Sequence, residues 1–207
     1  MPKFTMSVQS KTLSSGQEFL CAANHTSIFV LKGRVDIGGQ AFASGEGGYL
    51  AHGDRLSPLG GAAEIVQFDL HENANVENVE NSEAFEIPDG RAVLRLDQIC
   101  FPAGAIAYRH VHAGTGYRFL TLGQLEVRAD DHAITVGPGD SWFEPANSPV
   151  RATNLATAET AFVRAMVLPM NYLGKPTITY LNAEDADKPR LQSNQRFFDQ
   201  VIELKAT

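Results

Sequence analysis

Residues 104–123 read Gly-Ala-Ile-Ala-Tyr-Arg-His-Val-His-Ala-Gly-Thr-Gly-Tyr-Arg-Phe-Leu-Thr-Leu-Gly and form the most informative stretch of the chain. In an extended strand the side chains at i and i+2 point to the same face, so His110 and His112 would present two imidazoles side by side. Neutral imidazole is the commonest protein ligand for divalent transition metals. The stretch therefore predicts half of a metal site on a single strand.

The sequence pattern around this stretch is that of an all-β protein. From about residue 17 to residue 170, short apolar runs are separated by Gly, Pro, Asn and Asp, and long segments with helical periodicity are absent. The expected strands lie at residues 19–22, 26–31, 34–37, 48–50, 63–70, 92–100, 105–111, 117–122, 125–128, 133–136, 141–143 and 161–168.

The two halves of this region look like copies of each other. Residues 28–37 parallel residues 118–127, and Gly33 matches Gly123 in this comparison. Self-similarity of this kind indicates a repeated structural unit. A duplicated all-β unit of this length fits two small barrels or sandwiches.

Composition suggests where the units begin and end. Residues 76–90 are rich in Glu and Asn and are expected to be an acidic linker with a solvated surface. The expected domains are an N-terminal barrel over residues 1–75, a second barrel over residues 91–170 and a tail over residues 171–207. In that tail, residues 193–204 are predicted to form one short helix, because apolar residues recur there at helical spacing behind a serine N-cap.

The bulk properties favour a small-molecule partner. The 207 residues carry a formal net charge of −7 and have a pI of about 5.3, and they lack the Lys/Arg clusters with which proteins bind nucleic acids or anionic membranes. No apolar stretch approaches the length of a membrane span and the first residues lack a signal-peptide pattern, so we expect a cytoplasmic protein. Cys21 and Cys100 are too few for a disulfide framework and are expected to be buried, reduced thiols.

The second half resembles the barrel domain of the cupin superfamily. The first motif of that family is G-x5-H-x-H-x3,4-E-x6-G, and Gly104, His110, His112 and Gly123 match it at the right spacing. Together with the duplication, the resemblance implies a bicupin, with two tandem antiparallel jelly-roll barrels and a short C-terminal helix. It also implies a homodimer, because cupins commonly associate through sheet edges.

The second motif of the family, G-x5-P-x-G-x2-H-x3-N, is matched only in part. Residues 138–140 (Pro-Gly-Asp) and Asn154 fit its commoner form, but the later histidine of the family would fall near Val150. The glutamate of the first motif would fall at Gly116 or Tyr117, and neither is an ordinary metal ligand. The first barrel is expected to be degenerate and metal-free, because its ligand positions hold Leu20, Ala22, Thr26 and Leu56.

A third metal ligand would therefore have to come from another part of the second barrel. Glu144 is the candidate, because it ends a strand that in cupins runs across the barrel near the paired histidines. Two histidines and one carboxylate suit Fe(II), Mn, Ni or Zn. Two alternatives stay open. In the first, Glu144 points outward, and the site either binds no metal or completes the coordination of the metal with water. In the second, His110 and His112 are structural residues hydrogen-bonded to carbonyl groups.

Several aromatic and basic residues are expected at the same barrel mouth. Tyr108, Trp142 and Arg118 are candidate substrate-binding residues, and Arg118 could pair with a carboxylate or enolate oxygen through two hydrogen bonds. Tyr117 and Arg118 point to opposite faces of a regular strand. We expect Tyr117 to face inward, where it and Glu144 would be candidate catalytic proton carriers.

The resemblance implies a metal-dependent enzyme that acts on a small oxygenated organic molecule. Dioxygenase, decarboxylase, isomerase and lyase chemistry are all compatible, with the metal polarising an enolate or carboxylate oxygen, and the fold does not choose among them. The alternative is a non-catalytic small-molecule-binding or regulatory cupin, which the missing glutamate and later histidine favour. A storage or purely structural role fits less well with an imidazole pair next to Tyr and Trp.

Overall fold

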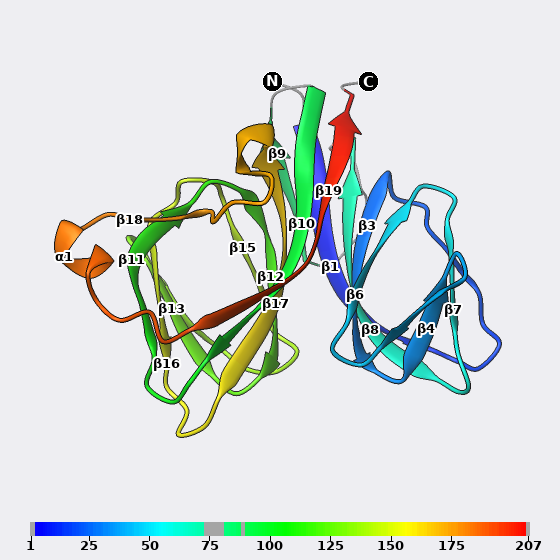
Figure 1. Ribbon diagram of the computed structural model, residues 1–207, viewed down its shortest axis with the longest axis horizontal. Helices are drawn as coiled ribbons and strands as arrows, with labels where there is room; N and C mark the ends of the chain where they lie inside the picture. Colours follow the sequence, from blue (N-terminus) through cyan, green and yellow to red (C-terminus); the bar gives the residue numbers. More distant parts are fainter. Residues whose placement is uncertain (1–2, 73–80, 88–89, 206–207) are drawn as a thin grey trace. The chain divides into compact units, whose positions relative to one another are not determined.

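The computed structural model describes residues 3–72, 81–87 and 90–205, and nearly all of their regular structure is β-strand (Figure 1). Their contacts divide them into two compact units: residues up to Arg91 together with those from Ile202 onward, and residues Ala92–Val201. The predicted all-β fold is confirmed. Within these described ranges, no helix combines the length and the apolar character needed to span a bilayer.

The first unit consists of two antiparallel sheets. One has the strand order β6-β3-β8-β1-β9 and the other has the order β2-β7-β4-β5. Their strands are β1 (Lys3–Leu13), β2 (Phe19–Leu20), β3 (His25–Lys32), β4 (Arg34–Ile37), β5 (Gln40–Ala43), β6 (Gly47–Ala51), β7 (Arg55–Pro58), β8 (Ala63–His71) and β9 (Ser82–Glu86).

The sheets of the second unit have the orders β15-β12-β17-β10-β19 and β14-β13-β16-β11-β18. Their elements are β10 (Gly90–Phe101), β11 (Ile106–His112), β12 (Thr115–Leu122), β13 (Leu125–Ala129), β14 (Ala133–Val136), β15 (Ser141–Glu144), β16 (Val150–Asn154), β17 (Thr160–Pro169), β18 (Ile178–Tyr180) and β19 (Ser193–Leu204). A short 3₁₀ turn, η1 (Met170–Tyr172), and a four-residue helix, α1 (Ala183–Ala186), flank β18 in the chain.

The two units repeat one strand order, as the duplication in the sequence suggests. The sheet β6-β3-β8-β1 corresponds to β15-β12-β17-β10, and the sheet β2-β7-β4-β5 corresponds to β11-β16-β13-β14. The correspondence extends to an irregularity: the ladder shifts register between Val30 and Lys32 in β3 and between Leu120 and Leu122 in β12. Each unit is a two-sheet antiparallel barrel of the jelly-roll type.

Gly33 and Gly123 follow these irregularities and need to be glycine for the same reason. Both have positive φ, 82° and 79°. A Cβ atom at Gly33 would lie 2.7 Å from the carbonyl oxygen of Ala62, and one at Gly123 would lie 2.8 Å from that of Glu159. Both the backbone conformation and the close approach of a neighbouring strand therefore exclude a side chain.

Replacing Gly123 with Ala is expected to lower the free energy of unfolding by about 2–4 kcal/mol, because backbone strain and a backbone clash add. Gly139→Ala is the matched control, since Gly139 also has positive φ (96°) but no atom lies within 4 Å of its would-be Cβ. The control should lose only about 1–2 kcal/mol, the strain part. Equal losses in urea denaturation would contradict this account of Gly123.

Two predictions about the chain between and after the barrels are corrected. Residues 193–204 form strand β19 and not a helix, and they extend the sheet by pairing with β10. A short α-helix lies instead at Ala183–Ala186. Within the expected linker, residues 82–86 are β9, which pairs with β1. The remainder of the expected linker falls partly at residues 76–80 and 88–89, outside the described residues.

The interior of the second barrel is layered. Side chains on alternate residues of a strand share a face, so the inward-facing residues of each strand can be read from one end of the strand to the other. One apolar cluster includes Ile99, Phe101, Leu120, Trp142 and Phe162, and another contains Val93, Met166 and Leu168. Between them, on the same faces of the same strands, lie four buried charged residues: Arg95, Asp97, Arg118 and Arg164.

Candidate functional site in the second barrel

Strand register aligns the buried charges into a row across one sheet. Asp97 of β10 is opposite Arg164 of β17, Arg164 is opposite Arg118 of β12, and Arg118 is opposite Trp142 of β15. Cross-strand partners have Cβ atoms about 4.5–5.5 Å apart, so their side chains meet on the inward face. We call the three charged residues of this alignment, Asp97, Arg164 and Arg118, the polar row.

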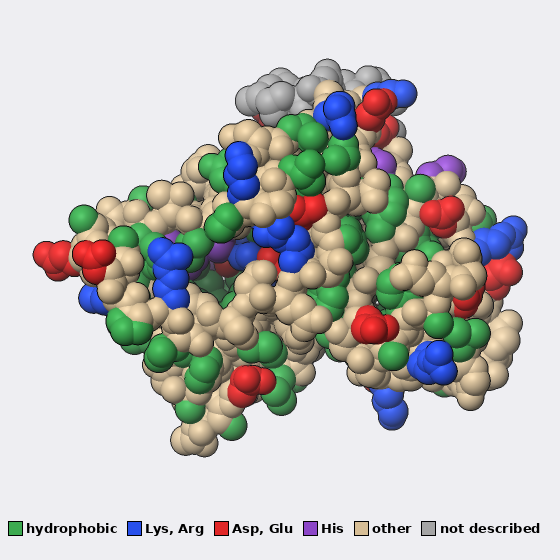
Figure 2. Space-filling model, viewed as in Figure 1, with side chains coloured by type: hydrophobic (Ala, Val, Ile, Leu, Met, Phe, Trp, Pro, Cys, Tyr) green, Lys and Arg blue, Asp and Glu red, His purple; other side chains and the backbone are tan. Residues whose placement is uncertain are grey.

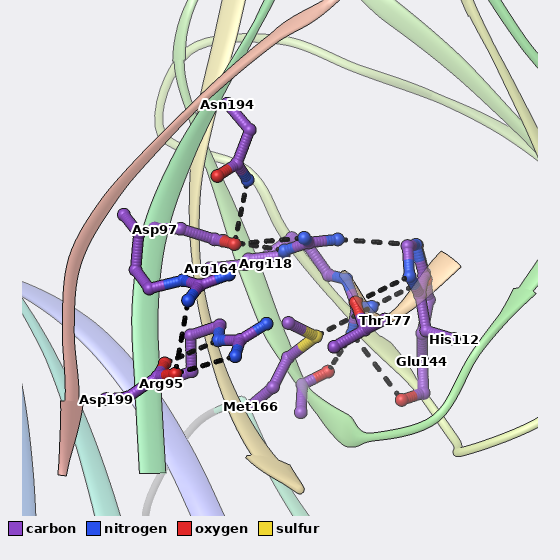
Figure 3. A network of polar contacts seen from close by, with 12 residues as sticks. Arg95, Asp97, His112, Arg118, Glu144, Arg164, Met166, Thr177, Asn194 and Asp199 are labelled. Carbon is purple, nitrogen blue, oxygen red and sulfur yellow. Dashed lines mark hydrogen bonds and ion pairs between the residues drawn. The ribbon is translucent and has the colours of Figure 1, made fainter. Parts of the chain in front are cut away.

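Arg164 is held in place from one side. Its Nε and Nη2 atoms donate to the two carboxylate oxygens of Asp97 at 2.7 and 3.0 Å, and Asn194 of β19 donates to Asp97 at 2.9 Å (Figure 3). The paired hydrogen bonds fix the plane of the guanidinium group. Its remaining nitrogen, Nη1, is directed toward His112, 3.3 Å from the ring Nε2 atom.

Glu144 lies inside the barrel and is already engaged. Its Oε2 atom forms an ion pair with Arg118 Nη2 at 2.7 Å, and its Oε1 atom accepts a hydrogen bond from Trp142 Nε1 at 2.8 Å. Burial lowers the pKa of Arg118 to about 10, although the charge of Glu144 opposes that shift. Gly116 is opposite Glu144 in the register, so the carboxylate stands beside a position expected for the glutamate of the first motif.

His110 and His112 face each other across 3.1 Å, measured between their Nε2 atoms. The Nδ1 atom of His110 lies 2.6 Å from the carbonyl oxygen of Tyr108, which assigns the ring proton to Nδ1 and leaves a lone pair on Nε2. Burial lowers the pKa of both imidazoles, and the charge of Arg164 lowers that of His112 further. Both rings are therefore neutral at pH 7.

These groups line a cavity of about 250 Å³. It lies below the range of about 300–1,000 Å³ that is typical of pockets for drug-sized ligands, so it suits a small molecule. One part of its wall is apolar and includes Phe101, Trp142 and Phe162, while His110, His112 and the polar row form another part. Figure 2 shows a hollow on this unit with histidine and basic side chains at it.

The structure brings together some of the residues predicted for the site and not others. His110, His112, Arg118, Trp142 and Glu144 all line the cavity. Two orientations are corrected, because neither tyrosine is part of that lining. Tyr117 is buried on the other face of β12, with its ring centre 5.2 Å from that of Phe143, and Arg118 takes the inward face instead. The ring of Tyr108 is covered by Lys188, whose Nζ lies 4.3 Å from the ring centre.

The residues present complete only part of a metal site. Two nitrogen ligands about 2.0–2.1 Å from one metal ion are roughly 3.0–3.4 Å apart, so the 3.1 Å between the two Nε2 atoms fits adjacent ligands. A third ligand does not converge on them: both oxygens of Glu144 are occupied, and Val150 lies opposite His110 where the later histidine was expected. Among the described residues, no group of three His, Cys, Asp or Glu side chains could hold a metal.

The sequence reasoning missed Asp97, Arg164 and residues 170–196, which follow β17 and which we call the covering segment. Arg164 is the one charge in the buried strand β17, and Arg95 and Asp97 are buried charges in β10; a charge in a buried strand needs a partner, so this signal was present. Tyr180, Arg190 and Arg196 also line the cavity, from the segment that follows β17. No pattern in that segment indicates that it returns to the barrel mouth.

Comparison with known families agrees with this geometry. A family model described as the cupin domain matches residues 98–166, which contain the histidine pair, Arg118 and Arg164. The second barrel is thus similar to the cupin domain over these residues. A search of curated protein sequences finds no match.

Solved structures share the fold across both barrels at low sequence identity. Lactobacillus farciminis oxalate decarboxylase in complex with formate aligns with a TM-score of 0.61 at 13% identity, over 89% of this chain and 82% of its own. A variant of Bacillus subtilis oxalate decarboxylase aligns with a TM-score of 0.59 at 14% identity, over 88% and 73%. AerE from Microcystis aeruginosa aligns with a TM-score of 0.55 at 12% identity, over 79% and 88%. At these identities the likeness shows the fold alone.

Proposed function

We propose that the cavity of the second barrel binds a small organic acid. The observation that carries this proposal is the orientation of Arg164: Asp97 holds one edge of its guanidinium group, and Nη1 is left facing the histidine pair inside the cavity. A carboxylate placed there would receive charge-assisted hydrogen bonds, each worth about 1.5–3 kcal/mol.

The remaining walls suit the rest of such a ligand. The apolar body would lie against Phe101, Trp142 and Phe162, which are removed from water. His110 offers an unprotonated Nε2 atom that can accept a proton from a ligand hydroxyl or from a carbon next to the carboxylate. The proposal keeps the small oxygenated ligand that the family resemblance implies. In this proposal an arginine, and not a metal, holds the acid.

The proposal predicts that carboxylates, but not their neutral amides, stabilise the protein against heat. Benzoate, butyrate and succinate are compared with benzamide, butyramide and succinamide by calorimetric unfolding. At a concentration of 100 Kd a bound acid should add about 2.7 kcal/mol, or raise the midpoint by about 5–10 °C for a chain of this length.

The control for this experiment removes the buried pair as a unit. In the double variant Asp97→Asn/Arg164→Gln no charge is left unpaired, so the fold should be retained while the stabilisation by acids is lost. If the amides stabilise the wild type as well as the acids do, or if none of the acids stabilises it, the site is not an organic-acid site.

A second candidate function, a metal-dependent enzyme acting on a small oxygenated molecule, is favoured by one observation. The lone pair of His110 Nε2 points at His112 Nε2 at a distance that suits two ligands of one ion. His110 and His112 would hold Fe, Mn, Ni or Zn, which would supply Lewis-acid chemistry when bound. Glu144 would have to leave Arg118 and Trp142 to become the third ligand.

A further inference from the structure

The covering segment, residues 170–196, follows β17, includes the first residues of β19 and supplies a second set of cations to the cavity. It contains β18, which pairs with β11 so that Tyr180 is opposite His110 and Ile178 is opposite His112. Through this pairing the segment lies directly beside β11, the strand that carries His110 and His112. Arg190 and Arg196 extend from it into the cavity lining.

These two arginines are incompletely paired. The guanidinium carbon of Arg190 lies 4.9 Å from the ring centre of Tyr180, and within the described ranges no carboxylate forms an ion pair with it. Arg196 reaches Asp199 only at 3.3 Å and the carbonyl oxygen of Lys175 at 3.3 Å. Its Nε atom is buried and has no hydrogen-bond partner in the described part of the chain.

The charges around the cavity do not balance. Five guanidinium groups line it: Arg95, Arg118, Arg164, Arg190 and Arg196. Three carboxylates pair with members of this set, namely Asp97, Glu144 and Asp199. An excess of two positive charges is left among these arginines, in a protein whose net charge is −7.

We propose that the ligand is a dianion with two separated acid groups, that is, a small dicarboxylate. One carboxylate meets Arg164 beside the histidine pair, and the other meets Arg190 and Arg196 on the covering segment. This inference rests on the proposed function, since it specifies the class of organic acid. Tyr180 lies between the two ends: its ring centre is 6.1 Å from that of His110 and it carries Arg190 on its face.

The two sets of arginines would hold the two ends of the ligand in different ways. A guanidinium group that is buried and held by Asp97 is a rigid receptor, whereas Arg190 on the covering segment can adjust to ligand length. A ligand that engages both sets would link the covering segment to the barrel. A monocarboxylate would engage only the first.

The test is a calorimetric titration of the full chain with malonate, succinate and glutarate, and with the monocarboxylates of equal carbon number, propionate, butyrate and pentanoate. The best dicarboxylate should bind at least tenfold more tightly than the monocarboxylate of equal carbon number. Arg190→Gln and Arg196→Gln should each reduce dicarboxylate affinity at least tenfold and leave monocarboxylate affinity within twofold. Arg128→Gln, which removes an exposed positive charge of β13 outside the cavity lining, is the control and should change neither.

The outcomes separate this inference from the function on which it rests. If monocarboxylates bind as tightly as dicarboxylates, or if Arg128→Gln weakens dicarboxylates as much as Arg190→Gln does, the inference is wrong and the organic-acid site stands. If inorganic phosphate competes as well as the best dicarboxylate, the two charges belong to one group and the inference is wrong. If no carboxylate of either series binds, the proposed function itself fails.

Discussion

Replacing Arg95 with Met is expected to lower the free energy of unfolding by about 3–5 kcal/mol, the usual cost of removing one partner from a buried ion pair. Its side chain is 1% exposed and pairs with Asp199 through two hydrogen bonds of 2.6 and 2.8 Å. It also donates to the carbonyl oxygens of Tyr172 and Lys175. One guanidinium group therefore fastens β10 to η1, to the loop after it and to β19.

Arg109→Met is the matched control for this prediction, because Arg109 also forms several hydrogen bonds, three in its case, with one carboxylate, that of Asp130. Both partners are exposed there, at 42% and 60%, so the loss should stay below about 1 kcal/mol. The measurement is urea denaturation of both variants. The account of Arg95 as a buried clamp is wrong if the two variants lose the same stability.

The same contact gives the variant a distinct pH dependence. Burial alone would raise the pKa of the Asp199 carboxyl, but hydrogen bonds from Arg95 and from the Gly174 amide hold it below its ordinary value. Such a carboxylate stabilises the fold above its unfolded pKa of about 3.9 and loses that contribution as the pH falls through its folded value. Arg95→Met should therefore lose less of its remaining stability than the wild type does between pH 5 and the acid limit, roughly the window over which carboxylates titrate.

Most of the fold prediction rested on the short apolar strands between turn residues and on the positions of the glycines. The repeat of Gly33 and Gly123 is visible in the sequence because both positions need positive φ and space for a neighbouring strand. Strand β19 was predicted as a helix, since Phe197, Val201 and Leu204 stand at helical spacing. It is a strand because it pairs with β10, and the sequence of β19 alone does not predict which strand it pairs with.

The histidine pair was predictable and the groups around it were less so. Spacing alone places His110 and His112 on one face of a strand, and their rings do meet. Every residue from Thr115 to Leu120 of β12 is buried, so hydrophobicity does not show which face of the strand is inward. The family pattern favours Tyr117 over Arg118 at the inward position, and the structure has Arg118 there. The charges of Asp97 and Arg164 in buried strands were the better guide, because a buried charge requires a buried partner.

The central claim is that the arginines and the neutral histidines of the second barrel hold an organic acid without a metal. The two carboxylates of this site are already paired, Glu144 with Arg118 and Trp142, and Asp97 with one edge of Arg164. A divalent cation near His112 would lie close to the guanidinium group of Arg164, which contacts the same ring nitrogen at 3.3 Å. Like charges at such a separation repel strongly in a buried site.

The most direct measurement is a calorimetric titration of the chain with succinate, first in excess EDTA and then after dialysis and addition of one equivalent of Mn²⁺ or Zn²⁺. Affinity should agree within threefold in all three conditions. It should fall at least 100-fold, or about 2.7 kcal/mol, in Asp97→Asn/Arg164→Gln, where the acid loses its charge-assisted hydrogen bonds. Binding that requires the metal, and that disappears in His110→Ala/His112→Ala while surviving in Asp97→Asn/Arg164→Gln, would contradict the claim and establish the histidine pair as a metal site.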